Sequence, residues 1–98
     1  MHIELLYFDG CPSWQQAERN LREAITLVGV DATVSLVHVG TPEDADRLSF
    51  RGSPTVLVDG ADPFAQPGDP VGLSCRVFRT PDGLRGVPTV GQLVDVLR

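Results

Sequence analysis

Two cysteines, Cys11 and Cys75, are the residues of this chain with the most distinctive chemistry. Cys11 follows an apolar run and the chain-breaking pair Asp9-Gly10, so it lies where a strand is expected to end. Pro12 suits the first position of a helix, which makes Cys11 the predicted N-cap. The free N–H groups of that helix favour an anion, so we expect the pKa of the Cys11 thiol to lie below its free value of about 8.5. Such a thiolate is a nucleophile or a ligand for a soft metal.

The two cysteines, Trp14 and His38 each allow a structural interpretation as well as a functional one. Cys11 could be a buried apolar thiol, although its place at a strand-to-helix junction favours a reactive one. Cys75 fits a buried position in an apolar strand about as well as an active one. Trp14 fits core packing better than a substrate platform, and His38 fits a polar strand end better than a base or a ligand.

The composition predicts one small globular domain, residues 1–98. Hydrophobic residues make up 42% of the chain and charged residues 21%, as expected for a packed core. The net charge is −5 and the arginines are scattered, so we expect no nucleic-acid partner. No apolar run approaches the roughly 18 residues of a membrane span, and a signal-peptide pattern is absent. We therefore expect a cytoplasmic protein without a membrane partner, whose cysteines suit redox chemistry, metal binding or burial better than a structural disulfide.

A strand, a helix and a second strand are predicted to position Cys11. The first strand covers residues 2–8, the helix runs from Pro12 to about Val28, and the second strand covers 32–39. A crossover of these lengths is right-handed and leaves both strands parallel. Parallel strands end at one edge of a sheet, so we expect His38 to lie at the same edge as Cys11.

The rest of the chain predicts two more strands and two more helices. Thr41 caps a short helix to about Phe50, and a strand covers 55–58. The loop 61–74 is rich in proline and glycine and suits a lid or plain surface equally well. Residues 75–79 predict a fourth strand, 80–83 a turn with proline at its second position, and Thr89 caps the final helix. The predicted core consists of Ile3, Leu5, Phe8, Leu21, Ile25, Leu36, Val56, Val58, Val77, Leu93 and Leu97.

This order of elements, with a cysteine at the start of the first helix, resembles the thioredoxin-like superfamily over the whole chain. The resemblance implies an α/β domain with a four-stranded mixed sheet in the order 2-1-3-4 and helices on both faces. Residues 51–55, Arg-Gly-Ser-Pro-Thr, are similar to the segment that holds the cis-proline of that family, which faces the reactive cysteine and binds substrate through neighbouring backbone. The expectation of a cis bond rests on this resemblance, because only about 5–6% of X-Pro bonds are cis. The candidate substrate-binding residues are Ser53, Pro54, Trp14 and Asp9.

Trp14 stands where thioredoxins carry their second cysteine, so a dithiol cycle within that motif is excluded. Residues 75–78 and 87–89 are similar to the region around the second catalytic cysteine of organomercurial (alkylmercury) lyases. That resemblance implies that Cys11 and Cys75 hold mercury as two thiolates. In those enzymes an aspartate three residues after the first cysteine relays a proton, but Trp14 occupies this place and Asp9 lies on the other side of Cys11. The resemblance therefore implies capture of a soft metal by the two thiolates more directly than cleavage of a carbon–mercury bond by a relayed proton.

The sequence predicts a thiol protein without a cofactor in which Cys11 is the reactive group. The first interpretation is a thiol oxidoreductase that works by a one-cysteine route, with a small-molecule thiol or a protein disulfide as its partner. The second is an alkylmercury lyase-like protein that binds mercury or another soft metal through Cys11 and Cys75. The third is a catalytically silent interaction domain.

The position of Cys75 separates the redox and metal-binding interpretations. In a plain hairpin the fourth strand begins far from Cys11, and its five residues span roughly 16 Å. The loop 61–74 is long enough to return, and the lyase resemblance implies that it does. We therefore expect the two Cα atoms within the distance of about 7 Å that a disulfide or a shared metal requires.

Overall fold

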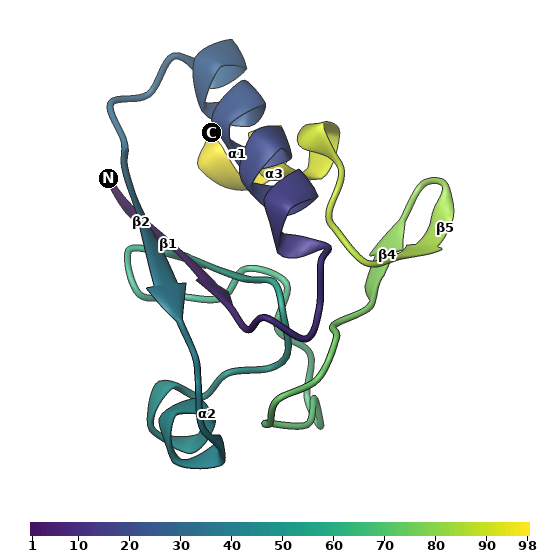
Figure 1. The fold of residues 1–98 in the computed structure, drawn as a ribbon. Helices are drawn as coiled ribbons and strands as arrows, with labels where there is room; N and C mark the ends of the chain where they lie inside the picture. Colours follow the sequence, from purple (N-terminus) through teal and green to yellow (C-terminus); the bar gives the residue numbers. More distant parts are fainter.

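The computed structural model describes residues 1–98, and its central sheet has three strands (Figure 1). β1 (His2–Tyr7) lies between β2 (Thr33–His38) and β3 (Thr55–Val58). β1 pairs with β2 in parallel and with β3 antiparallel. The predicted parallel pairing and the order 2-1-3 of these strands are confirmed.

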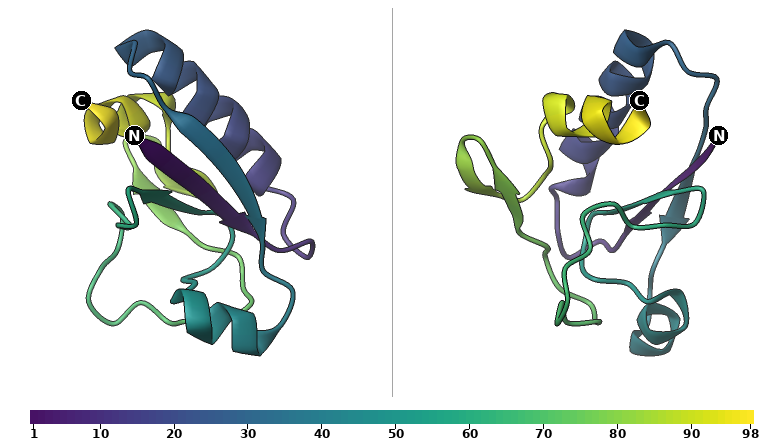
Figure 2. Two further views of the ribbon diagram at one scale, coloured as in Figure 1. Left: turned by 90° about the vertical axis from the view of Figure 1, so that its left-hand side faces the viewer. Right: turned by 180° about the vertical axis from the view of Figure 1, so that it is seen from behind.

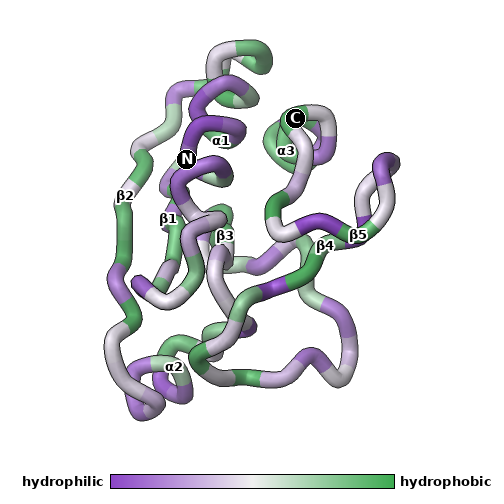
Figure 3. The backbone as a smooth tube through the Cα atoms, turned by 45° about the vertical axis from the view of Figure 1, so that its right-hand side comes forward, coloured by the Kyte–Doolittle hydropathy of each residue, from purple (hydrophilic) through white to green (hydrophobic).

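Helices α1 (Trp14–Val28) and α3 (Val90–Leu97) lie side by side over one face of this sheet (Figures 1 and 2). The apolar residues of α1 recur at helical spacing, and hydrophilic and hydrophobic colours alternate along the helix in Figure 3, which is typical of a helix with one buried face. Gly29 ends α1 in the left-handed conformation. Thr89 begins α3 with a capping box, as its hydroxyl accepts from the N–H of Gln92.

Helix α2 (Pro42–Leu48) covers the opposite face of the sheet. The hydroxyl of Thr41 accepts from the N–H of Asp44 at 3.1 Å, which confirms the predicted cap, and the helix ends at Leu48 rather than near Phe50. Helices therefore cover both faces, as predicted. None of the three helices combines the length and the apolar content needed to cross a bilayer.

The core forms in two layers because side chains alternate along β1. Ile3 and Leu5 point toward α1 and α3, whereas Leu6 points toward α2. The larger cluster consists of Ile3, Leu5, Ala17, Leu21, Ala24, Val56, Leu93 and Leu97. The smaller cluster consists of Leu6, Val39, Ala45 and Phe50.

The predicted fourth strand of the sheet is wrong. β4 (Phe78–Thr80) pairs only with β5 (Gly83–Arg85), and this hairpin stands apart from the central sheet (Figure 2). Residues 74–76 pair instead with the chain just before β3, so the backbone does not return along β3. The predicted turn with Pro81 at its second position is confirmed within the hairpin.

Two predicted core residues are exposed. Val77 is 62% exposed because its neighbours Arg76 and Phe78 point inward, which leaves it on the outer side of an extended segment. Leu36 is 43% exposed because β2 is an edge strand with a neighbour on one side only. The other predicted core residues are buried or partly buried.

Candidate functional site

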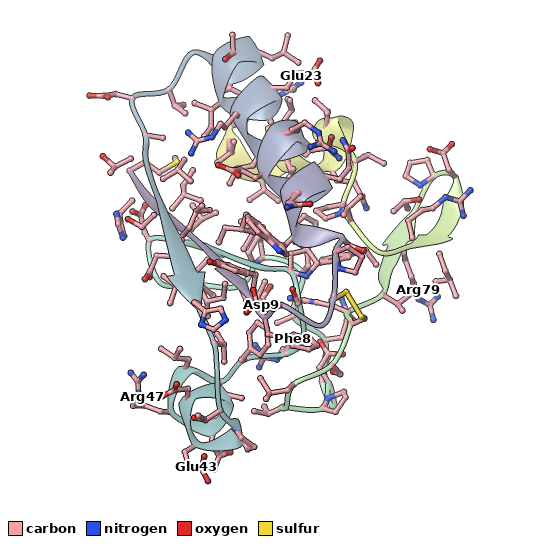
Figure 4. All side chains as sticks on the ribbon, viewed as in Figure 1. Phe8, Asp9, Glu23, Glu43, Arg47 and Arg79 are labelled. Carbon is pink, nitrogen blue, oxygen red and sulfur yellow. A yellow bond between two sulfur atoms is a disulfide. The ribbon has the colours of Figure 1, made fainter.

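Cys11 and Cys75 form a disulfide, which appears as the yellow bond in Figure 4. The two residues are 64 positions apart in the sequence, and their Cα atoms are 5.7 Å apart. The predicted approach of the two cysteines is confirmed. The loop 61–74 does bring the chain back to the edge of the sheet at which β1 ends.

Cys11 lies in the turn between β1 and α1, four residues after the end of β1 and two residues before the N-cap of α1. Its backbone N–H donates to the carbonyl of Phe8 at 3.4 Å, and this turn places the sulfur beside the helix. Ser13 is the N-cap and its side chain makes no capping bond, so the prediction that Cys11 caps the helix and Pro12 opens it is wrong. The Oγ of Ser13 lies 3.9 Å from the Cys11 sulfur. After reduction this hydroxyl can donate to a Cys11 thiolate.

Cys75 is held by a single parallel β-bridge to Ser53. The N–H of Ser53 donates to the carbonyl of Ser74 at 2.7 Å, and the N–H of Arg76 donates to the carbonyl of Ser53 at 3.0 Å. Gly52 makes this approach possible, because a Cβ there would lie 3.1 Å from the Ser74 carbonyl oxygen. Its φ of 107° is also one that other residues rarely adopt.

Ser53 lies between the two chain segments that carry Cys11 and Cys75. The Ser53-Pro54 peptide bond is cis, as the sequence resemblance implied, and both residues are buried. The Oγ of Ser53 accepts from the N–H of Phe8 at 3.4 Å, so this one residue contacts the segments that carry both cysteines. Its backbone N–H and carbonyl are already paired within the chain. A substrate that pairs with them, as predicted, must first displace residues 74–76.

The two ends of the disulfide differ in exposure. Cys11 is only 2% exposed, whereas Cys75 is exposed and lines a cleft with a volume of about 810 Å³. Arginines 51, 76 and 79 also line this cleft. A reagent from solvent therefore reaches the disulfide from the side of Cys75.

A buried ion pair anchors the loop 61–74 beside Cys75. The guanidinium of Arg76 donates to both carboxylate oxygens of Asp62, at 2.8 and 3.3 Å, and it lies over the ring of Phe78. The side chains of Arg76 and Asp62 are 6% and 4% exposed. Arg51 lies 3.7 Å from the same carboxylate. Sequence reasoning missed these residues, although arginines directly beside Cys75 and Gly52 were a usable signal.

Asp9, Trp14 and His38 gather at the edge where β1 and β2 end. The Nε2 of His38 and the Oδ2 of Asp9 are 3.0 Å apart, and the side chain of Asp9 is 82% exposed. The rings of Tyr7 and Trp14 stack with centroids 4.2 Å apart, and Trp14 packs against the larger core cluster. These residues contact one another, and Trp14 also packs against the core.

No family model, curated protein or solved structure matches this chain. No group of three or more histidine, cysteine, aspartate or glutamate side chains is arranged to hold a metal ion.

Proposed function

We propose that this protein is a thioredoxin-like thiol–disulfide exchange protein that uses Cys11 and Cys75 as a pair. The observation that carries the proposal is the asymmetry of the disulfide, with one cysteine buried before α1 and the other exposed in a cleft. The sheet order 2-1-3, and the position of Cys11 between β1 and α1, support the thioredoxin-like part of the proposal.

In the reductive direction a small-molecule thiolate attacks the sulfur of Cys75. A bond forms between the incoming sulfur and Cys75, the Cys11–Cys75 bond breaks, and its electron pair stays on Cys11 as a thiolate. The hydroxyl of Ser13, whose Oγ lies 3.9 Å from that sulfur, can then donate a hydrogen bond to the thiolate. A second thiol then attacks the mixed disulfide, which releases an oxidised small-molecule disulfide and leaves the protein with two thiols.

In the oxidative direction, in which the protein itself is oxidised, Cys75 again reacts first because it is the exposed cysteine. The thiolate of Cys75 attacks a substrate disulfide and forms a mixed disulfide, and the substrate's second sulfur leaves as a thiolate. Cys11 then attacks the Cys75 sulfur and releases the remaining half of the substrate. The Cα separation of 5.7 Å supports this two-cysteine cycle over the one-cysteine route expected from sequence, in which Cys11 worked alone.

The test uses single-cysteine variants incubated with glutathione disulfide. We expect Cys11→Ser to accumulate a mixed disulfide at Cys75, because no internal thiol can resolve it, whereas reduced wild type returns to the internal disulfide. The Cys75→Ser variant should react more slowly, because Cys11 is buried. Intact mass spectrometry measures all three products. If Cys11→Ser gains no glutathione while its far-ultraviolet circular dichroism matches wild type, the proposal is wrong.

Soft-metal capture is a second candidate function, and the same 5.7 Å separation favours it because two thiolates at this spacing can share one metal ion. Mercury titration of the reduced protein should give one ion per chain that resists a chelator. The Cys75→Ser variant should lose its ion to the same chelator. Equal retention by both proteins would rule out capture by the pair. An inert interaction domain is indicated if neither exchange nor capture is observed.

A further inference from the structure

We propose that the cleft beside Cys75 selects small thiols that carry a carboxylate, and the disulfides of such thiols, as exchange partners. This inference rests on the proposed exchange function and names its substrate class. We call the site the arginine cleft and define it by Arg51, Arg76, Arg79, Phe64, Phe78 and Cys75, all of which line it.

Positive charge in the arginine cleft is not fully neutralised. Arg76 is paired with buried Asp62 through two hydrogen bonds. Arg51 reaches the same carboxylate only at 3.7 Å, its side chain is 30% exposed, and its buried Nε has no hydrogen-bond partner. Arg79 is exposed and forms no ion pair. Two guanidinium groups therefore remain able to bind an anion.

The acids near the arginine cleft do not cancel this charge. Asp69 lines the cleft, but its carboxylate accepts from the backbone N–H of Gln66 at 2.7 Å, within the loop. With Asp62 included, the three arginines exceed the two acids by one unit of charge. The whole chain carries −5, so the arginine cleft is a locally positive site on an acidic protein.

The placement of this charge matches the approach of a nucleophile. An incoming thiolate must reach the Cys75 sulfur from the cleft, since Cys11 is buried behind it. Because Arg51 and Arg79 line the same cleft as Cys75, we expect a carboxylate carried by the attacking thiol to meet one of these two guanidinium groups. Figure 4 shows Arg79 projecting from β4, the strand that follows Cys75 in the chain.

The size of the cleft favours a small molecule over a protein chain. Its volume of about 810 Å³ lies within the range of roughly 300–1,000 Å³ typical of small-molecule sites. The rings of Phe64 and Phe78 pack edge to face, with centroids 5.5 Å apart, and give the cleft an apolar part beside its charged one. A thiol with a short carbon chain and one carboxylate suits this mixture.

The experiment measures reduction of the wild-type disulfide by three small thiols of different charge. The probes are 3-mercaptopropionate, 2-mercaptoethanol and cysteamine, which are anionic, neutral and cationic apart from their sulfur. Each rate is expressed per thiolate and corrected for thiol basicity. We expect the anionic thiol to react about five-fold faster than the neutral one at low ionic strength, because a solvent-accessible ion pair between its carboxylate and an arginine stabilises the transition state by about this factor. In 1 M salt, where the screening length is about 3 Å, the ratio should approach one.

Variants locate the source of this selectivity. Arg79→Gln and Arg51→Gln should each lower the ratio of anionic to neutral rates. Arg47→Gln removes the same charge from α2, far from Arg79 in Figure 4, and should leave the ratio unchanged. A wild-type ratio near one, or a ratio that neither cleft variant lowers, overturns this inference while the exchange function stands. Failure of all three thiols to reduce the disulfide overturns both proposals.

Discussion

Ser53 is hydrogen-bonded to the chain on both sides of Cys75, accepting from Arg76 and donating to Ser74. The exposed cysteine is therefore fixed by a buried serine beside β3, and not by a strand of its own. Because Ser53 also contacts Phe8, the geometry of the disulfide depends on a few residues around one backbone bridge. Substitutions at these residues should change both stability and reactivity.

Replacement of Gly52 by alanine should destabilise the protein by about 2–3 kcal/mol. The added Cβ would lie 3.1 Å from the Ser74 carbonyl oxygen, and φ is 107°. Gly29→Ala is the control, since Gly29 also has a positive φ but nothing within 4 Å of an added Cβ, and about 1 kcal/mol is expected there. Urea unfolding of the oxidised proteins measures both. Equal losses at the two positions would contradict a steric role for the contact with residues 74–76.

Replacement of Asp62 by asparagine should cost about 3 kcal/mol of unfolding free energy. It removes the negative partner of the buried Arg76 guanidinium, which cannot lose its own charge. Asp44→Asn breaks the exposed pair with Arg47 and should cost at most about 0.5 kcal/mol. Denaturant unfolding compares the two variants. A loss at Asp62 as small as that at Asp44 would mean that this ion pair does not hold the loop.

Replacement of Ser13 by alanine should raise the apparent pKa of the Cys11 thiol. The hydroxyl 3.9 Å from the sulfur is then no longer available to stabilise the thiolate. The rate of alkylation against pH, measured in the Cys75→Ser background, reports this pKa for Cys11 alone. Ser35→Ala on β2 is the control and should not move the profile. If the profile of the Ser13→Ala variant coincides with that of its parent, Ser13 does not stabilise the Cys11 thiolate.

Local patterns explain why much of the fold could be predicted from the sequence. The apolar run of β1, the stripe along α1 and the cap at Thr41 each depend on residues close in the chain. The approach of Cys11 and Cys75 could be predicted because the loop 61–74 is long enough to bring the chain back. These features required only the spacing of residue types and general rules of chain connection.

The site around Cys75 depends on distant partners and was less predictable. Arginine is usually exposed, and nothing near Arg76 in the sequence marks Asp62, fourteen residues earlier, as its partner. Residues 75–79 read as one strand because they are mostly apolar, but the bridge to Ser53 uses the backbone of Cys75 and leaves Val77 exposed. The register of a single bridge carries no local signature in the sequence.

The disulfide also makes residues 11–75 a closed covalent ring in the oxidised protein. Every residue of the loop 61–74 is partly or fully exposed, so a protease can cut a bond there, and a single cut opens the ring without releasing either fragment. The C-terminal fragment, which carries α3, stays tethered through Cys75. The nicked chain should migrate as two pieces on a gel only after reduction, which gives a direct readout of the redox state inside a cell.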